Sequence, residues 1–258
     1  MGTVEEEVLD PKFKDHNFYS DVGSLWWLAQ ISRPDIFLAV HRCSKFQNRP
    51  SNKLFRWIKT IFTYLSHTVN CGLVYKRSNS TTPDLSGYVD ASFGSEEDRS
   101  SRVGWFFLFR GNLVSWTSET VERIMLSSTE AECRGLVQIS KENVWHRQFH
   151  GELGLYPPNS PTILFEDNTA SISLSNDPGL THKKVKHYGL EWSYFKQRVE
   201  KKEVEIKYLR TTDQPADILT KPLPIKQFIT LRDIVMGDFK LQNSSISKVN
   251  LVMILVSK

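Results

Sequence analysis

Apolar residues in the first part of the chain follow the spacing of helices. Residues 21–40 carry apolar side chains three and four positions apart, which predicts helical structure. Residues 51–67 predict a second helix because their apolar residues form one stripe: Leu54, Trp57, Ile58, Ile61, Phe62 and Leu65. The short apolar run at 72–75 predicts a strand. Residues 1–80 are therefore expected to form a small, mainly helical segment.

The pattern changes from helical to strand-like after residues 76–83, a polar stretch that ends in proline and predicts a boundary. Three short runs rich in aromatic and β-branched residues then predict strands: 85–93, 103–110 and 113–117. The pair Gly111-Asn112 lies between the last two runs and predicts a tight hairpin turn. Strands joined in this way are expected to be antiparallel.

Helical and strand patterns alternate over the rest of the chain. A long helix is expected over residues 129–153, followed by a strand, two helices, a strand and a short helix: 162–166, 169–175, 187–200, 203–209 and 213–220. Three antiparallel strands followed by alternating helices and strands imply an α/β fold of the α+β kind, a mixed sheet with helices on its faces. Residues 225–258 hold no clear motif and stay an unassigned tail.

Composition excludes several protein classes. The 258 residues are 40% hydrophobic and 24% charged, as in ordinary globular proteins, so neither disorder nor a membrane class is indicated. No apolar run reaches the roughly 18 residues that a membrane-spanning helix needs. The three scattered cysteines indicate a reducing compartment and argue against a structural zinc site. The net charge of +4 permits a polyanionic partner without requiring one.

Four carboxylates stand at structured places in this pattern. Asp90 lies inside a predicted strand, Asp167 ends another, and Glu132 and Asp217 fall early in helices. If the sheet forms as expected, all four can reach one spot, where like charges would repel strongly without cations. An all-oxygen site selects hard ions such as Mg²⁺ or Mn²⁺. Two such ions about 3.5–4 Å apart can activate a water and stabilise the leaving oxygen of a phosphodiester.

Structural alternatives exist for most of these residues. Thr129 and Glu132 have the spacing of a helix capping box, and Asp167-Asn168 could cap the helix that follows. Asp217 could merely complement the positive end of its helix. A mid-strand Asp90 has little structural purpose. Taken together, in this order and on these elements, the four carboxylates favour a metal site.

Four segments carry a resemblance to a known family: GYVDA at 87–91, LSSTEAE at 126–132, EDNTASI at 166–172 and DQPADILTKPL at 213–223. They resemble the ribonuclease H domain of copia-type (Ty1/copia) retrotransposon Pol polyproteins, and the resemblance covers about residues 18–224. Upstream, residues 19–25 and 33–36 resemble the end of the same polyprotein's reverse transcriptase. The catalytic Asp-Asp motif of the polymerase is absent from the sequence, so autonomous DNA synthesis is not expected.

The resemblance implies a ribonuclease H-like fold, a five-stranded mixed sheet with flanking helices. It implies three parts of the chain: a helical remnant of the reverse transcriptase thumb or connection at 1–80, a ribonuclease H-like domain at 84–224 and the unassigned tail at 225–258. It also implies an intracellular location, cytoplasmic within a virus-like particle or nuclear.

The activity implied by the resemblance is hydrolysis of the RNA strand of RNA–DNA hybrids with two Mg²⁺ ions, which Mn²⁺ can replace. Asp90 would bridge both metals, Glu132 and Asp167 would complete the ligands of one ion, and Asp217 would help to hold the other. Glu132, rather than Glu130, aligns with the family's catalytic position. The implied partners are the hybrid and the rest of a reverse transcriptase, with no membrane.

Further side chains are candidates for substrate contact, each with a structural alternative: Ser127, Ser128, Asn168, Lys183, Lys186 and His187. The basic residues could contact phosphates or lie in a solvated loop, and the others could bind the RNA backbone or cap helices. The segment 98–104 departs from the family's usual Arg/Ser/Thr-rich stretch, which could affect hybrid binding. Two other functions compete: a catalytically silent, domesticated remnant that binds nucleic acid or protein, and, less favoured by the order of the acids, an integrase-like enzyme.

Overall fold

A single mixed sheet organises the molecule in this computed structural model, which describes residues 10–77, 84–96, 98–157, 159–177 and 189–237. The strand order is β3-β2-β1-β4-β5. The first three strands, β1 (Leu85–Ser92), β2 (Ser101–Phe109) and β3 (Asn112–Val121), pair antiparallel. Strand β4 (Thr162–Glu166) runs parallel to β1, and β5 (Val204–Tyr208) runs parallel to β4. The five-stranded mixed sheet expected from the sequence is confirmed.

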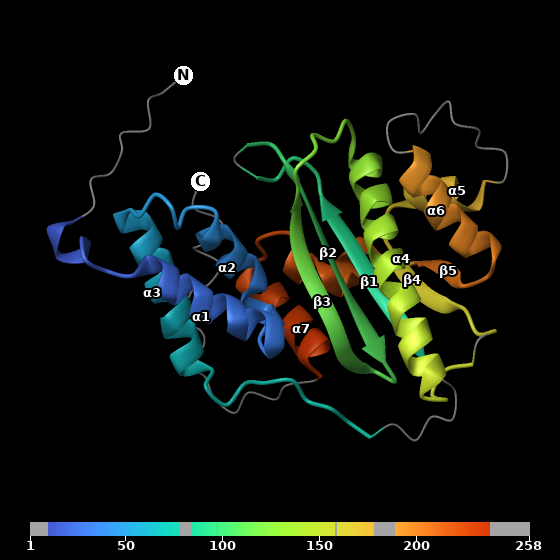
Figure 1. The fold of residues 1–258 in the computed structure, drawn as a ribbon, viewed down its shortest axis with the longest axis horizontal. Coiled ribbons are helices and arrows are strands. Elements are labelled where there is room, and N and C mark those ends of the chain that lie inside the picture. The colour runs from blue at the N-terminus through green and yellow to red at the C-terminus, as the bar shows by residue number, and fades with distance from the viewer. Residues whose placement is uncertain (1–9, 78–83, 97, 158, 178–188, 238–258) are drawn as a thin grey trace.

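Helices cover the two faces of the sheet, so the molecule has three layers (Figure 1). One face carries α4 (Ser128–Glu152), α5 (Thr169–Asn176) and α6 (Gly189–Glu200). The opposite face carries the other four helices: α1 (Phe18–Ile31), α2 (Phe37–Ser44), α3 (Asn52–His67) and α7 (Ile225–Met236). Four short 3₁₀ helices complete the described elements: η1 (Pro11–Phe13), η2 (Pro34–Ile36), η3 (Thr211–Asp213) and η4 (Pro215–Leu219).

Helix α3 forms where the sequence predicts a helix from its stripe of apolar residues. Ser51 caps its first turn by accepting a hydrogen bond from the Leu54 backbone at 3.1 Å. The buried stripe differs from the predicted one, because Tyr64 lies inside whereas Phe62 is 42% exposed. The predicted strand at 72–75 is wrong: this segment is irregular in the structure.

The β2–β3 hairpin turns one residue earlier than the sequence predicts. Arg110 and Gly111 form the turn with φ angles of 51° and 74°, and Asn112 already pairs with Phe109 as the first residue of β3. Two successive positive φ angles match the right-handed twist of the strands, and glycine adopts such an angle without steric cost.

The expected last helix, residues 213–220, is two 3₁₀ helices instead of one α-helix. Gln214 separates them with an extended backbone (φ −76°, ψ 104°), because a residue before proline is driven out of the helical region. Its side chain donates to the Val89 carbonyl at 2.9 Å, which ties the start of η4 to β1. The element that carries Asp217 is therefore attached directly to the central strand.

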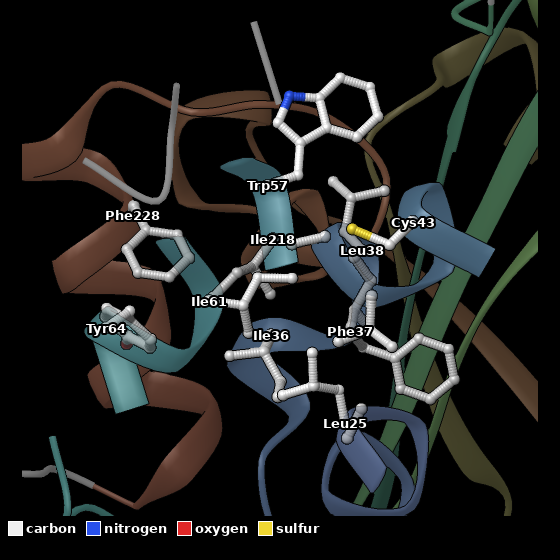
Figure 2. Packing of buried hydrophobic residues seen from close by; sticks show 14 of the residues in the cluster. Leu25, Ile36, Phe37, Leu38, Cys43, Trp57, Ile61, Tyr64, Ile218 and Phe228 are labelled. Carbon is white, nitrogen blue, oxygen red and sulfur yellow. The ribbon is translucent and has the colours of Figure 1, made fainter. Parts of the chain in front are cut away.

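Two hydrophobic cores lie on the two sides of the sheet. The first joins α1, α2 and α3 to sheet residues such as Phe106, and includes Ile218 of η4 and Phe228 of α7 (Figure 2). Residues 225–236, unassigned from the sequence, are thus a helix packed into this core. The second core joins the other sheet face to α4 and α6. The domain boundaries at 80, 84 and 224 stay a prediction. The N-terminal helices and the sheet share the first core.

Two further expectations concern cysteines and membranes. The three cysteines are buried thiols rather than disulfides: Cys43, Cys71 and Cys133. No helix in the described part of the chain combines the length and the apolar character that crossing a membrane requires.

Candidate metal centre

Three of the four predicted carboxylates meet at one point. Asp90 on β1, Glu132 on α4 and Asp167 just after β4 each offer one oxygen, and these oxygens all lie within 4.8 Å of one another. Asp90 is 1% exposed and Glu132 is 6% exposed, so most of this negative charge is withdrawn from water. The three residues come from separate elements, and the pairing of β1 with β4 brings the two strand carboxylates together.

The start of α4 leaves Glu132 available to this cluster. Ser127 is the N-cap and accepts from the Glu130 backbone at 3.1 Å, while the Glu130 carboxylate accepts from the Leu126 backbone at 2.8 Å. The capping roles therefore belong to Ser127 and Glu130, and the alternative that pairs Thr129 with Glu132 is wrong. Glu132 lies two residues after Glu130, about half a turn further along, where it reaches Asp90 and Asp167.

Helix α5 is capped in a similar way, by the residue after Asp167. The Asn168 side chain accepts from the Ala170 and Ser171 backbones, both at 3.0 Å. Asn168 rather than Asp167 is thus the cap. Among the other substrate-contact candidates, Ser128 is exposed on the first turn of α4. The three basic ones lie outside the described residues: Lys183, Lys186 and His187.

Asp217 joins the cluster through a lysine. The Lys221 ammonium lies 2.8 Å from Asp217 Oδ1 and 3.6 Å from Asp90 Oδ1. The Thr220 hydroxyl donates a hydrogen bond to the other oxygen of Asp90. Sequence reasoning missed Lys221 and Thr220 as members of the site. The spacing of four residues between Asp217 and Lys221, typical of ion pairs along helical turns, was the available signal.

Glu166 is a fifth carboxyl beside the site, and sequence reasoning missed it too. It is fully buried at the end of β4, and its Oε1 accepts from the Asn168 backbone at 2.9 Å. Its Oε2 has no hydrogen-bond partner among the described residues, and neither has Glu132 Oε2. Buried polar atoms in proteins are normally satisfied, so the Glu132 oxygen, which belongs to the cluster, favours an electropositive ligand there.

Burial governs the protonation of this cluster. It raises the pKa of Asp90, and it raises the pKa of Glu132 and Glu166 well above the usual range, helped by neighbouring carboxylates. Burial followed by the Asp90 charge raises the pKa of Asp217 to about 7, against the opposing effect of Lys221. Burial alone would lower the pKa of Lys221, but Asp90 and Asp217 raise it.

These residues fit a divalent cation. All the donors are oxygens, which hard ions such as Mg²⁺ and Mn²⁺ prefer. A bound cation would satisfy the unpartnered Glu132 oxygen and would stabilise the ionised carboxylates that burial otherwise disfavours.

Two plant proteins match this chain over most of its length. The retrovirus-related Pol polyprotein from transposon TNT 1-94 of Nicotiana tabacum is 32% identical over 219 residues, 84% of this chain. The Pol polyprotein from transposon RE1 of Arabidopsis thaliana is 34% identical over 203 residues, 78% of this chain. The chain is homologous to copia-type Pol polyproteins over most of its length. The resemblance stated from the sequence motifs is confirmed.

The copia-type Pol relatives are much longer than this chain, which spans only 16% of the Nicotiana protein and 14% of the Arabidopsis protein. A shorter relative is the secreted RxLR effector protein 161 of Plasmopara viticola, 35% identical over 133 residues. That match covers 51% of this chain and 92% of the effector. No family model matches the chain.

Solved structures with similar folds are distant. The N-terminal RNase H domain of Rv2228c from Mycobacterium tuberculosis matches 58% of this chain and 96% of its own, at 11% identity and a TM-score of 0.38. The foamy viral protease-reverse transcriptase in complex with an RNA/DNA hybrid matches 75% of this chain and 24% of its own, at 12% identity and a TM-score of 0.43. Because both TM-scores are this low, the fold is assigned from the strand order of the sheet and not from the similarity to these structures.

Proposed function

We propose that this chain is a ribonuclease H that hydrolyses the RNA strand of RNA–DNA hybrids with two divalent metal ions. The observation that carries the proposal is the convergence of Asp90, Glu132 and Asp167, whose oxygens lie within 4.8 Å of one another. Homology to copia-type Pol polyproteins supports it, as does the ion-paired Asp217 beside the same cluster. Mg²⁺ is the proposed cofactor, and Mn²⁺ is expected to replace it.

The carboxylates would divide the work of holding the metals. Asp90 would contact both ions, Glu132 and Asp167 would complete one ion's ligands, and Asp217 would help to hold the second. When bound, the ions supply an activated water and stabilise the leaving oxygen of the phosphodiester. Among the chain's own groups, Lys221 offers an ammonium to a phosphate oxygen, and Thr220 holds Asp90 in place with its hydroxyl.

The proposed partner is an RNA–DNA hybrid, together with the remaining reverse transcriptase of a longer Pol chain. Ser127 and Asn168 use their side-chain oxygens as helix caps, but both stand beside the carboxylates and could still face the hybrid. Ser128 and the basic residues Lys183, Lys186 and His187 remain candidates for phosphate contact.

Cleavage of a strand-labelled hybrid tests the proposal. The chain is expected to cut only the RNA strand with Mg²⁺ or Mn²⁺ and not with EDTA. Asp90→Asn should abolish cutting, because a neutral amide cannot hold a divalent ion as a carboxylate does. Asp84→Asn is the matched control, since Asp84 is an exposed aspartate just before the same strand.

Other outcomes would point to the alternative functions. A folded protein that binds the hybrid, with or without Asp90→Asn, and never cuts it would be a silent binding module. Cutting that survives Asp90→Asn would place the chemistry elsewhere and would contradict the proposed site.

A further inference from the structure

The end of η4 lies on a row of three residues that crosses the sheet. Asp90, Gly104 and Ser118 are successive cross-strand partners on β1, β2 and β3. A Cβ on Gly104 would lie 2.6 Å from the Leu219 Cβ and 2.8 Å from the Thr220 Cγ2. The backbone of β2 and the end of η4 are thus in direct contact beside Asp90.

A hydrogen-bond chain leads from this contact to the metal centre. The buried Ser118 hydroxyl donates to the Leu219 carbonyl, and it accepts from Arg102 Nη1 at 3.0 Å. Leu219 is followed by Thr220, whose hydroxyl donates to Asp90. Arg102, on β2, is therefore two hydrogen bonds from the peptide unit that links η4 to Thr220.

Arg102 also reaches the helices on the same face of the sheet. Its side chain is fully buried, and its Nε donates to Glu96 at 2.7 Å. Its Nη2 donates to the Nδ1 of His41, on α2, at 3.1 Å. Lys45, directly after α2, pairs with the other Glu96 oxygen at 2.9 Å. Burial and then the Arg102 charge lower the pKa of His41 to about 4, which suits a neutral imidazole that accepts this hydrogen bond.

Helix η4 needs such outside support. It is a 3₁₀ helix of five residues, and such helices have weak internal hydrogen bonds. Its start is held by Gln214, which donates to the Val89 carbonyl, and its end by Ser118, which donates to the Leu219 carbonyl. Asp217 lies between these two attachments, so its position depends on both.

We propose that Arg102 is a positioning residue of the carboxylate site, which acts through Ser118 and the Leu219 carbonyl to hold Asp217 and Thr220 against Asp90. The same guanidinium is hydrogen-bonded to His41 of α2, so the position of the N-terminal helices helps to set the geometry of the carboxylate site. Within residues 98–104, the segment that departs from the family pattern, Arg102 is 0% exposed and so acts inward.

The metal-binding part of this inference rests on the proposed function, so the test has a readout with metal and one without. Ser118→Ala removes the hydroxyl that joins Arg102 to Leu219 and leaves the Arg102–Glu96 pair intact. Tyr64→Phe is the control: it removes another buried hydroxyl, which donates to Asp35 at 2.7 Å and belongs to a separate hydrogen-bond group with Arg33. Both variants are made in the full chain, and their stability is measured by denaturant unfolding.

The first readout is amide hydrogen exchange without metal. The Thr220 and Lys221 amides both donate to the Asp217 carbonyl at 3.1 Å, so they report on η4. Ser118→Ala should accelerate their exchange, whereas Tyr64→Phe should accelerate it only as far as it lowers global stability.

The second readout is Mn²⁺ affinity by electron paramagnetic resonance. Ser118→Ala should weaken it roughly tenfold, as is typical when a group that orients a ligand is lost.

A third variant tests whether the site needs the hydrogen bonds of the Arg102 guanidinium or only its positive charge. Arg102→Lys keeps a cation beside Glu96 but loses the fork that reaches Ser118 and His41. It should change both readouts in the same direction as Ser118→Ala, and the double variant should be less than additive. If it fails to fold, Ser118→Ala alone decides.

Equal effects of Ser118→Ala and Tyr64→Phe on exchange at Thr220 and Lys221 would overturn the inference. So would unchanged exchange in Ser118→Ala. If the unmodified chain binds no Mn²⁺, the proposed function fails, and the exchange readout still decides whether Arg102 and Ser118 hold η4.

Discussion

Asp217 shows how single residues at this site balance burial against charge. Burial and Asp90 favour its neutral form, Lys221 favours the ionised form, and burial prevails, because the pKa rises from 3.8 to about 7. Asp90, Glu132 and Glu166 shift in the same direction. Without a cation, the folded protein therefore binds more protons than the unfolded chain between pH 4 and 7. By linkage, Asp217 stabilises the fold fully below about pH 4, and this contribution is lost as the pH rises through about 7.

Thermal unfolding with and without metal tests this balance. With EDTA, Asp217→Asn should lose less stability than the unmodified chain between pH 5 and pH 8, because it lacks one carboxyl with a raised pKa. Mg²⁺ should raise the Tm of the unmodified chain more at pH 8 than at pH 5, since metal and protons compete for the same oxygens. Identical pH profiles for the two proteins would show that Asp217 ionises freely in the fold. The exposed Asp84→Asn serves again as control.

The residues of the site differ in how readily they can be predicted from the sequence. Asp90 could be predicted because a carboxylate inside a strand needs an explanation. Glu132 was identified by its motif, although the local spacing with Thr129 suggested a cap; only the structure shows that Ser127 and Glu130 fill that role. Glu166 could not be predicted, since its contribution depends on its burial at the end of β4 and on the nearby Glu132 charge, which no local pattern reveals.

At the scale of elements, helices and strands with strong periodicity were predictable and their junctions were less so. Helix α4 was expected at 129–153 and spans Ser128–Glu152. The run at 72–75 forms no strand; its Val74 backbone N–H donates instead to the Met236 carbonyl at the end of α7, at 2.9 Å. Helix α7 was not predicted, because its apolar residues are explained only by the core in which they are buried, and the local sequence does not show that core.

The close approach of β2 and η4 gives a prediction at this scale. Gly104→Ala would place a Cβ 2.6 Å from the Leu219 Cβ, so η4 must shift. We expect a loss of about 1–3 kcal/mol, typical of overpacking, together with weaker Mn²⁺ binding. Gly23→Ala on α1 is the matched control: its Cβ would meet nothing within 4 Å, and alanine should be neutral or stabilising in a helix. Unfolding by urea and Mn²⁺ titration measure both effects, and full-strength metal binding by Gly104→Ala would contradict the contact.

At the scale of the whole molecule, the helical segment and the sheet are joined by more than a linker. Side chains of α1, α2 and α3 share a core with Phe106 of β2, Ile218 of η4 and Phe228 of α7 (Figure 2). The buried Arg102 network adds a polar connection between α2 and the sheet. The sequence suggested a boundary near residue 80 because the pattern changes there, but a change of pattern along the chain does not show which surfaces pack against each other.

A shared core implies that both parts unfold together. Phe228→Ala on α7 removes a ring that is 6% exposed, and we expect a loss of about 3–5 kcal/mol. Tryptophan fluorescence and far-ultraviolet circular dichroism should then report one urea transition, shifted as a whole, because Trp residues stand on both sides of the sheet. Ile234→Ala, on the same helix but 50% exposed, should change stability by no more than about 0.5 kcal/mol. Two separate transitions, with only the earlier one shifted by Phe228→Ala, would instead mean that the helical segment and the sheet unfold as independent domains, and the coupling proposed through Arg102 would then be confined to the sheet.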